Sequence, residues 1–378
     1  MTKRERRLNI VVISAWYPSP DQPMNGVFVR DHARAASRYH DVAVLANGGM
    51  RTDARPFRVS PAEDDELATL RLTYAPSRLP FAAGSRYVRA VLAGLRRLER
   101  AGNRPDLLHA HIHEVGIAAL VAGRRHGIPV VLSEHSSHFS LGSLRRSARL
   151  RARLVSRQVD LVCPVSDDLR RRMEAQGIRG RFRVVPNPVD TDLFVPAPPV
   201  QDEPITGLFV GGLHPVKRVE LLLRAVARLP PGTLRLEIVG DGPARAELEA
   251  LAADLAITRL VQFRGYLPKH RVAERIRAAG FLVLPSSIET FGVVVAEALA
   301  VGRPVLASRT GAIPEIVSDS NGLLVPAGDE EALAAGLGRM VKEHLGFDWQ
   351  TLSRDAHERF GLDAVGRRWS DVYRSLAA

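Results

Sequence analysis

The sequence contains a single cysteine, Cys163, among its 378 residues. One thiol cannot form an internal disulfide, which excludes the disulfide-stabilised secreted scaffolds and makes a reducing cytoplasm the expected compartment. Cys163 lies in the apolar run VDLVCPVS. We therefore expect a small buried side chain there rather than a nucleophile.

Long hydrophobic runs are missing as well. No uninterrupted apolar stretch approaches the ~20 residues that a membrane-spanning helix needs. The segment MTKRERRLNIVVISAWYP combines a basic start with a short apolar run, but it lacks the small-residue cleavage pattern of a signal peptide. We expect its apolar part to form the first buried strand.

Acidic residues are scarce relative to basic ones: 41 Asp and Glu against 53 Lys and Arg give a formal net charge of +12. This excess favours an anionic partner, such as a phosphate ligand, an anionic lipid surface or a nucleic acid. An arginine-rich proteome would produce the same excess, and composition alone leaves both explanations open.

The densest basic segment is SLRRSARLRARLVSRQ, in which Leu144, Leu150 and Leu154 recur at helical spacing. A basic amphipathic helix can lie on an anionic membrane through Arg145, Arg146, Arg149 and Arg153. The same pattern suits a helix that packs its leucines inward and exposes a basic face to solvent. No aromatic residues interleave with the arginines, so we do not expect a nucleic-acid partner. The six arginines of this segment are Arg145, Arg146, Arg149, Arg151, Arg153 and Arg157.

Short β-branched runs alternate with longer helical patterns along the whole chain, which predicts parallel sheets with crossover helices. A proline-rich segment at 186–204 divides the chain into halves with about six strands each. We therefore predict an α/β protein of two doubly wound, Rossmann-like domains that face a cleft. The predicted bounds are 1–190 for an amino-terminal domain, 191–204 for a linker, 205–360 for a carboxyl-terminal domain, and 361–378 for a carboxyl-terminal helix whose packing the sequence leaves open, a return to the first domain being one option. The strand candidates of the first half are LNIVVIS, DVAVLA, LLHAHI, IPVVLSE, DLVCPVS and FRVVPN, and those of the second are ITGLFVGG, LRLEIVG, LVQFRGY, FLVLPS, RPVLAS and GLLVP.

Two strand-to-helix turns of the second half carry residues suited to an anionic ligand. In GLFVGGLHPVKRVELLLRA a strand ends at Gly211 and Gly212, and Lys217 lies at the start of the next helix. Glycines allow the backbone to come close to a ligand, and a helix amino terminus favours an anion. Gly-Gly at such a turn is also a common steric solution, and the motif is neither a dinucleotide fingerprint nor a P-loop.

The segment FLVLPSSIETFGVVVAEALAVGRPV predicts a strand, a polar loop with Glu289, and a helix capped by Thr290. The amides of Phe291, Gly292 and Val293 would then face the ligand, and Glu297 would lie within the helix. Because an unpaired buried carboxylate costs several kcal/mol, Glu297 needs a partner, either a nearby arginine or a bound polyol. A glutamate on the wet side of the helix is the alternative. A glycoside-hydrolase carboxylate pair is a further one, but it accounts for neither the glycines nor Lys217.

The first half offers a loop glycine, Gly26, before its first helix, and three alternating histidines, His109, His111 and His113. Three histidines on one strand face would suit a metal. We expect instead that His109 belongs to the strand and that His111 and His113 fall where it ends.

Nearly the whole chain resembles the retaining glycosyltransferases of family 4, which have the GT-B fold. Its most specific element is the pair of glutamates separated by seven residues, Glu289 and Glu297. The segments that carry the resemblance are NGVFVRDHARA, DLLHAHIHE, VVPNPVDTDLF, FVGGLHPVKRVELLLRA, VGDGPARAELE, VQFRGYLP, LPSSIETFGVVVAEALAVGRPVLAS and TGAIPEIV with NGLLVPAGD.

The resemblance implies roles for individual residues in binding a nucleotide-sugar. Gly26 and Lys217 would approach the donor diphosphate, and His111 would lie by the donor sugar. The backbone around Tyr266 would hold the base.

The two glutamates would bind opposite ends of the same donor. Glu289 would bind hydroxyls of the sugar, near the amides of Phe291 and Gly292, and Glu297 would bind the ribose hydroxyls. A carboxylate can accept from neutral hydroxyl donors, which would account for a buried Glu297.

The implied reaction is transfer with retention, in which the leaving diphosphate helps to take the acceptor's proton. No metal or other cofactor is expected, so cations and helix amino termini must stabilise the leaving charge. The implied acceptor is a lipid-linked or polysaccharide glycan, handled in the cytoplasm or at the inner face of the membrane.

The sequence departs from the family where many relatives have an arginine, since Gly212 occupies that position. Arg218, Arg303 and Arg309 are candidates for the missing cation, and the residues do not choose among them. A non-catalytic partner subunit, or a nucleotide-sugar epimerase or hydrolase, would be compatible with this loss.

Overall fold

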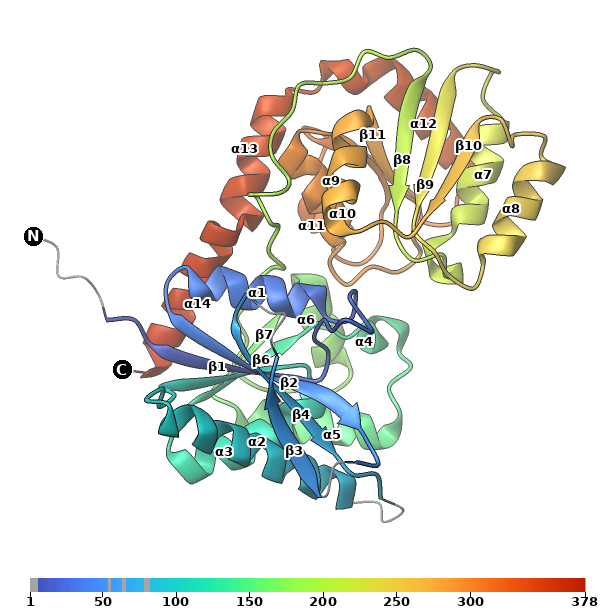
Figure 1. The fold of residues 1–378 in the computed structure, drawn as a ribbon. Coiled ribbons are helices and arrows are strands. Elements are labelled where there is room, and N and C mark those ends of the chain that lie inside the picture. Colours follow the sequence, from blue (N-terminus) through green and yellow to red (C-terminus); the bar gives the residue numbers. More distant parts are fainter. Residues whose placement is uncertain (1–5, 54–55, 63–65, 78–81, 378) are drawn as a thin grey trace, which may run out of the picture. The chain divides into compact units, whose positions relative to one another are not determined.

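The computed structural model describes residues 6–53, 56–62, 66–77 and 82–377 of the chain. These form two compact units, which we call unit 1 (Met1–Pro188 with Leu362–Ala378) and unit 2 (Val189–Gly361). Each is an α/β unit built on its own sheet (Figure 1).

Unit 1 has a seven-stranded sheet in the order β3-β4-β2-β1-β5-β6-β7. All neighbouring pairs are parallel except β3 with β4. Helices α2, α3 and α5 cover one face, and α1 and α14 cover the other (Figure 1). The strands are β1 Asn9–Ser14, β2 Asp41–Met50, β3 Phe57–Pro61, β4 Ala68–Tyr74, β5 Leu107–His111, β6 Val130–Glu134 and β7 Leu161–Pro164. The helices are α1 Val27–Ser37, α2 Ala82–Arg100, α3 His113–His126, α4 His138–Leu141, α5 Arg146–Gln158, α6 Asp167–Ala175 and α14 Leu362–Ala377.

Unit 2 has a six-stranded, fully parallel sheet in the order β10-β9-β8-β11-β12-β13. Helices α7, α8 and α12 lie on one face, and α9, α10 and α13 lie on the other (Figure 1). The strands are β8 Ile205–Val210, β9 Leu234–Val239, β10 Val261–Gly265, β11 Phe281–Leu284, β12 Val305–Ser308 and β13 Gly322–Val325. The helices are the 3-10 turns η1 Pro215–Lys217 and η2 His344–Gly346 with α7 Val219–Ala227, α8 Arg245–Asp254, α9 Lys269–Ala278, α10 Val293–Val301, α11 Ile313–Ile316, α12 Glu330–Glu343 and α13 Trp349–Phe360.

The two predicted doubly wound sheets are confirmed, with two differences in unit 1. The predicted strand FRVVPN is wrong, because only Phe182 forms an isolated bridge, with Val162. Strands β3 and β4 went unpredicted. In β4 the buried positions are Thr69, Leu70 and Leu72, and they are interrupted by polar residues, a pattern weaker than the continuous apolar runs of the central strands.

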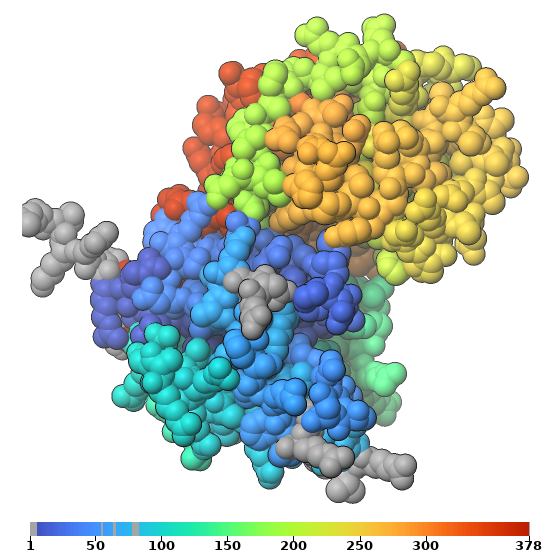
Figure 2. Space-filling model, viewed as in Figure 1, coloured from blue at the N-terminus to red at the C-terminus, as the bar shows by residue number. Residues whose placement is uncertain are grey.

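The proline-rich segment expected to be a linker packs onto unit 2 over part of its length. The Arg303 guanidinium donates to the carbonyl oxygens of Ala197 and Pro198 at 2.8 and 2.7 Å. The amide of Ala197 bonds Val301. In Figure 2 this light green segment lies against the orange surface of the same unit. Bonds to a buried guanidinium fix its path, so it is not a free tether.

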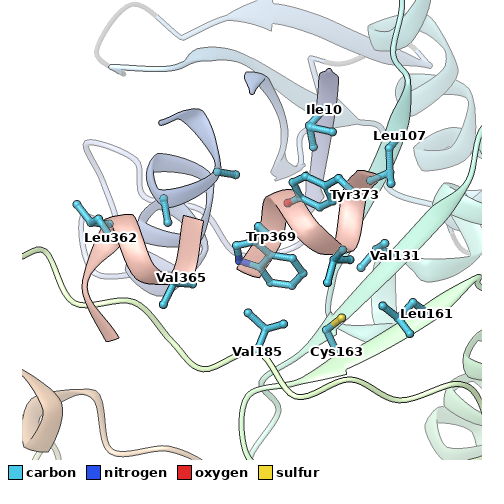
Figure 3. Packing of buried hydrophobic residues seen from close by; sticks show 13 residues of the cluster. Ile10, Leu107, Val131, Leu161, Cys163, Val185, Leu362, Val365, Trp369 and Tyr373 are labelled. Carbon is cyan, nitrogen blue, oxygen red and sulfur yellow. The ribbon is translucent and has the colours of Figure 1, made fainter. Parts of the chain in front are cut away.

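Helix α14 completes the core of unit 1. Trp369 and Tyr373 are both fully buried among residues of the sheet, including Ile10, Leu107 and Cys163 (Figure 3). The Trp369 indole N–H also donates to His32 Nδ1 at 2.9 Å. Burial raises the pKa of the Cys163 thiol, as befits the inert side chain that we expected.

Replacing Trp369 with alanine should destabilise unit 1 by about 3–5 kcal/mol, since a fully buried indole leaves a cavity. Urea unfolding monitored by circular dichroism measures the loss. Asp371→Ala removes an exposed side chain of the same helix and should cost less than ~0.5 kcal/mol. Equal losses for the two variants would contradict this packing.

Candidate functional site

The candidate site of unit 2 lies at the carboxyl ends of β8 and β11. Strand order reverses at this pair, because β9 and β10 extend the sheet on one side and β12 and β13 extend it on the other. In open parallel sheets such a switch point leaves a crevice in which ligands bind. The loops after β8 and β11 contain most of the predicted donor-binding residues of this unit.

The loop after β8 lies close to the loop after β9. The amide of Leu213 donates to Asp241 at 2.9 Å, and Ala244 donates back to Leu213. At Gly240, with φ of 138°, a Cβ would lie 1.9 Å from the carbonyl oxygen of Gly211. A larger residue at 240 would therefore push the strand-end loop with Gly211 out of place.

An ion pair joins the two loops at the switch point. Lys217 Nζ donates to Glu289 Oε1 at 2.6 Å, and Ser286 Oγ donates to the same oxygen at 2.8 Å. Glu289 is only 9% exposed. Two residues that lie 72 positions apart, each predicted from its own motif, are thus brought into direct contact.

Backbone contacts fix the position of Glu289. The amide of Ser287 bonds Val216 in the η1 turn, and the hydroxyl of Thr310 donates to the carbonyl of Ser287. A Cβ at Gly311 would lie 1.8 Å from the carbonyl oxygen of Glu289. Three loops, which follow β8, β11 and β12, therefore hold this carboxylate.

Helix α10 begins next to this ion pair, but not in the way that we predicted. Its first residue is Val293 and its cap is Gly292, with φ of 87° and no side-chain cap hydrogen bond. The predicted Thr290 cap is wrong because the chain enters the helix through a left-handed residue, which favours glycine. Phe291 is buried against Phe360, so only its backbone can contribute to a site. Val295 donates the first backbone hydrogen bond of the helix, to the carbonyl of Gly292, so the amides of Val293 and Val294 precede it, and no acidic residue occupies the first turn.

Glu297 lies within α10 and is 7% exposed. Its partner is Lys269 Nζ at 3.6 Å, from the first residue of α9, and not an arginine. The same ammonium lies 5.6 Å from the centre of the Phe194 ring. The alternative that places Glu297 on the solvent-exposed face of the helix is therefore wrong. Tyr266 directly follows β10, at the carboxyl end of that strand, and is 47% exposed.

Of the three candidate arginines, Arg303 and Arg218 are bound to other groups of the protein. Arg303 is 1% exposed and bonds the carbonyls of Ala197, Pro198 and Arg277, and burial lowers its pKa to about 10. Arg218 is ion-paired with Glu220 at 2.6 Å. Arg309 follows β12 and is exposed.

In unit 1, Gly26 and His111 lie at the switch point between β1 and β5. Gly26 caps α1 with φ of 71°, and a Cβ there would lie 2.2 Å from the carbonyl oxygen of Trp16. His111 is the last residue of β5 and is fully buried. Its Nδ1 lies 3.0 Å from His135 Nε2, and its buried Nε2 has no hydrogen-bond partner in the described part of the chain.

The three alternating histidines do not converge on one point. His109 bonds Tyr373 and Ser133, whereas His113 begins α3 and bonds Glu134 at 2.8 Å. Burial alone would lower the pKa of His113, but the Glu134 carboxylate raises it overall. Across the described ranges, no group of three or more His, Cys, Asp or Glu side chains is placed to hold a metal.

A network of buried imidazoles surrounds His111. Its ring stacks on that of His135 and lies 5.5 Å, centre to centre, from that of His32. His32 in turn bonds Asn187 and accepts from Trp369. His32 and Trp369 are helical residues, and the sequence analysis assigned neither of them a role.

Helix α5 presents its leucines to solvent. Leu150 is 68% exposed and Leu154 is 49% exposed, while Ala152 and Val155 face inward. The alternative in which the leucines pack inward is therefore wrong for Leu150 and Leu154, whereas Leu144, just before the helix, is buried. Arg153, which we expected to face a membrane, donates to the carbonyl of Gln176 at 2.7 Å and so links α5 to the end of α6. No helix in the described part of the chain is long and apolar enough to cross a bilayer.

The buried histidines should make unit 1 sensitive to acid. Burial lowers the pKa of His32 to about 4, only partly offset by the bond to Asn187, and it lowers the pKa values of His109, His111 and His135 well below 6.5. In the unfolded chain these histidines have their ordinary pKa of about 6.5, so they bind protons at a higher pH than they do in the folded unit. Stability is therefore complete above pH 6.5 and falls between pH 6.5 and 4, by about 3 kcal/mol for His32 alone.

Urea unfolding between pH 7.5 and 4.5 measures this dependence. His32→Gln should flatten it, whereas His270→Gln, at an exposed position of unit 2, should not. In wild type, imidazole ¹³C shifts should show neutral buried rings at pH 5.5. Protonated rings at that pH would contradict the prediction.

Residues 26–193 match the family described as "Glycosyltransferase Family 4", and residues 204–343 match "Glycosyl transferases group 1". The D-inositol 3-phosphate glycosyltransferase of Frankia alni is 33% identical over 324 residues, covering 76% of this chain and 77% of the relative. The corresponding enzyme of Acidothermus cellulolyticus is 32% identical over 343 residues, covering 82% of this chain and 75% of the relative.

Solved structures show the same fold. Sucrose-phosphate synthase from Thermosynechococcus elongatus superposes with a TM-score of 0.75 at 23% identity, over 98% of this chain and 99% of the other. Anabaena Alr3699/HepE in complex with UDP and glucose gives 0.76 at 19% identity, over 98% and 100%. The fold is therefore GT-B, and the chain belongs to the group 1 glycosyl transferases of glycosyltransferase family 4.

Proposed function

We propose that this enzyme transfers a sugar from a UDP- or GDP-linked donor to a lipid-linked or polysaccharide acceptor, with retention and without a metal. The observation that carries the proposal is the Lys217–Glu289 ion pair at the sheet's switch point, beside the amino terminus of α10. This arrangement offers one cation, one helix amino terminus and one hydrogen-bond acceptor within a single group of loops.

The donor's charges and hydroxyls match these groups. Lys217 and the first amides of α10 can stabilise a diphosphate, because ammonium and helix amino termini both favour anions. Glu289 can accept hydrogen bonds from sugar hydroxyls, and Glu297 can do so from the ribose. In this proposal Lys217 helps to orient Glu289, and Lys269 does the same for Glu297.

Retention follows in the proposal from attack on the same face from which the diphosphate leaves. The acceptor hydroxyl loses its proton to the departing phosphate oxygen as the new glycosidic bond forms, so no side-chain nucleophile is required. Stabilisation of the leaving charge is then the chief task of the protein. The roles expected for Gly26 and His111, at the switch point of unit 1, stay predictions.

A hollow in unit 1 supports binding of a hydroxylated acceptor. It has a volume of about 610 Å³ and lies at the carboxyl ends of β1 and β2. Tyr17, Asn25, Asn47, Arg51 and Arg71 are among its lining residues. Amide and guanidinium donors beside an aromatic ring suit a glycan, and the two arginines suit one with an acidic or phosphate group.

A phosphorylated cyclitol is a second candidate acceptor. The relatives described above carry the name D-inositol 3-phosphate glycosyltransferase. The two arginines of the unit 1 hollow are compatible with this acceptor as well.

We further propose that α5 places the enzyme at the cytoplasmic face of an anionic membrane. Arg146, Leu150, Leu154 and Arg157 are exposed and follow one another at spacings of four, four and three residues, along one helical stripe. Arg145 adds charge at the start of the helix, and Arg149 is half-buried beside the stripe. Apolar and basic side chains mixed on one exposed face are typical of interfacial helices.

The donor is tested by a thermal-shift screen against UDP-, GDP- and ADP-sugars, in which only binders raise the midpoint. With the selected donor, Glu289→Gln and Lys217→Ala should each lower turnover at least tenfold while the melting temperature of the free enzyme stays within a few degrees. Product analysis with lipid-linked, polysaccharide and inositol 3-phosphate acceptors then identifies the acceptor.

Consumption of the donor without a glycosylated product would favour an epimerase or hydrolase. Unchanged turnover in both variants would remove the site assignment. A purified chain that neither binds nor consumes any donor would indicate a non-catalytic partner subunit.

Membrane binding is tested by sedimentation with vesicles containing 40% phosphatidylglycerol. Replacing both Leu150 and Leu154 with aspartate should reduce the bound fraction at least fivefold, because it removes apolar contact and adds negative charge. Leu345→Asp, at a 49% exposed leucine of unit 2, is the matched control and should bind as wild type does. Equal binding of all three proteins would refute the role of α5.

A further inference from the structure

The loop after β8 has a second nitrogen-bearing side chain that no motif singled out. His214 directly precedes the η1 turn and is exposed. A Cβ built on Gly212 would lie 3.0 Å from Cδ2 and 3.5 Å from Nε2 of this histidine. The imidazole therefore occupies the space into which a side chain at position 212 would have to extend.

Lys217 lies over the neighbouring glycine in the same way. Its Cε is 3.9 Å from the Cβ position of Gly211. Since consecutive Cα atoms are about 3.8 Å apart, the ammonium and the imidazole approach adjacent residues of one strand end. Backbone bonds fix this arrangement, because His214 donates its amide to Gly212, and Lys217 donates its amide to His214, both at 2.9 Å.

The charge of the leaving group calls for such a second donor. A nucleoside diphosphate carries more than one negative charge, whereas the Lys217 ammonium is already shared with the Glu289 carboxylate. Arg303 is buried on backbone carbonyls, and Arg218 is paired with Glu220. Within the described residues, the imidazole of His214 makes no hydrogen bond, so both of its nitrogens are available to a ligand.

We propose that His214 takes the place of the arginine that position 212 lacks, and that it donates a hydrogen bond to the diphosphate of the donor. Glycine at 212 and histidine at 214 then form a matched pair, in which the missing Cβ makes room for the ring. This inference rests on the proposed function, since it assigns a further contact to the same donor site. An imidazole N–H supplies a donor in its neutral form and a full charge when protonated.

The inference is tested by calorimetric titration of UDP, GDP and the corresponding nucleosides. His214→Ala should weaken binding of the diphosphate that wild type selects about tenfold, the effect of losing a hydrogen bond to a charged group. It should leave nucleoside affinity unchanged. His214→Phe keeps the ring shape without a donor and should show the same loss, which separates hydrogen bonding from packing.

Restoring the missing residue provides a second test. Gly212→Arg alone should not improve affinity, because its Cβ meets the histidine ring. Combined with His214→Ala, it should recover most of the lost diphosphate affinity and of kcat/KM. Arg235→Ala removes an exposed cation near the start of β9, at the opposite edge of the sheet, and should match wild type.

The outcomes separate this inference from the function on which it rests. If wild type binds neither UDP nor GDP, the proposed function fails and the inference fails with it. If wild type binds but His214→Ala stays within twofold, or loses nucleoside affinity equally, only the role of His214 is overturned. A diphosphate-specific loss in Arg309→Ala with none in His214→Ala would assign the second cation to Arg309.

Discussion

The parallel pairing of β8 with β11 is the constraint on which the candidate donor site depends. Phe281 is paired with Gly207, and Leu282 with Leu208. A Cβ at Gly207 would lie 3.0 Å from the Phe281 ring, so the ring packs over a position without a side chain. This register sets the relative height of the two strand ends, and a shift by one residue would reverse the side-chain directions of the strand. The contact between Lys217 and Glu289 is available only in the observed register.

Close contacts between backbone segments of neighbouring loops, more than side-chain hydrogen bonds, hold the site together. At Gly240 and Gly311 a Cβ would fall within 2 Å of a carbonyl oxygen of a neighbouring loop. Backbone cannot change rotamer, so such contacts fix loops more firmly than a pair of flexible side chains would. The polar groups of the site are thereby held in place before any ligand binds, and preorganisation of this kind is what electrostatic stabilisation of a leaving group requires.

The sequence was sufficient for the fold, and it indicated Lys217 and Glu289, which the structure brings into contact, because both depend on local patterns. Continuous apolar strands predict buried parallel sheets, and Glu289 and Glu297 stand out because carboxylates are rare in such surroundings. The misses depend on tertiary contacts. The sequence left the inward face of α5 open, because only the fold shows that Ala152 and Val155 are buried while Leu150 and Leu154 are not. Thr290 was a plausible cap from composition alone, but the positive φ at Gly292 is a property of the folded turn. His214 and His32 were not singled out, because residue type and spacing do not show that the His214 ring lies over Gly212 or that His32 contacts Trp369.

The position of α14 affects the order in which the two units can fold during synthesis. Unit 2 is one continuous segment, Val189–Gly361, so it can fold as soon as that segment has emerged from the ribosome. Unit 1 begins earlier in the chain but ends with Leu362–Ala378. Domains usually fold in the order of their synthesis, yet the sheet of unit 1 must wait for Trp369 and Tyr373 to cover its exposed apolar face. Until α14 has been synthesised, the apolar side chains that Trp369 and Tyr373 cover in the folded unit stay exposed.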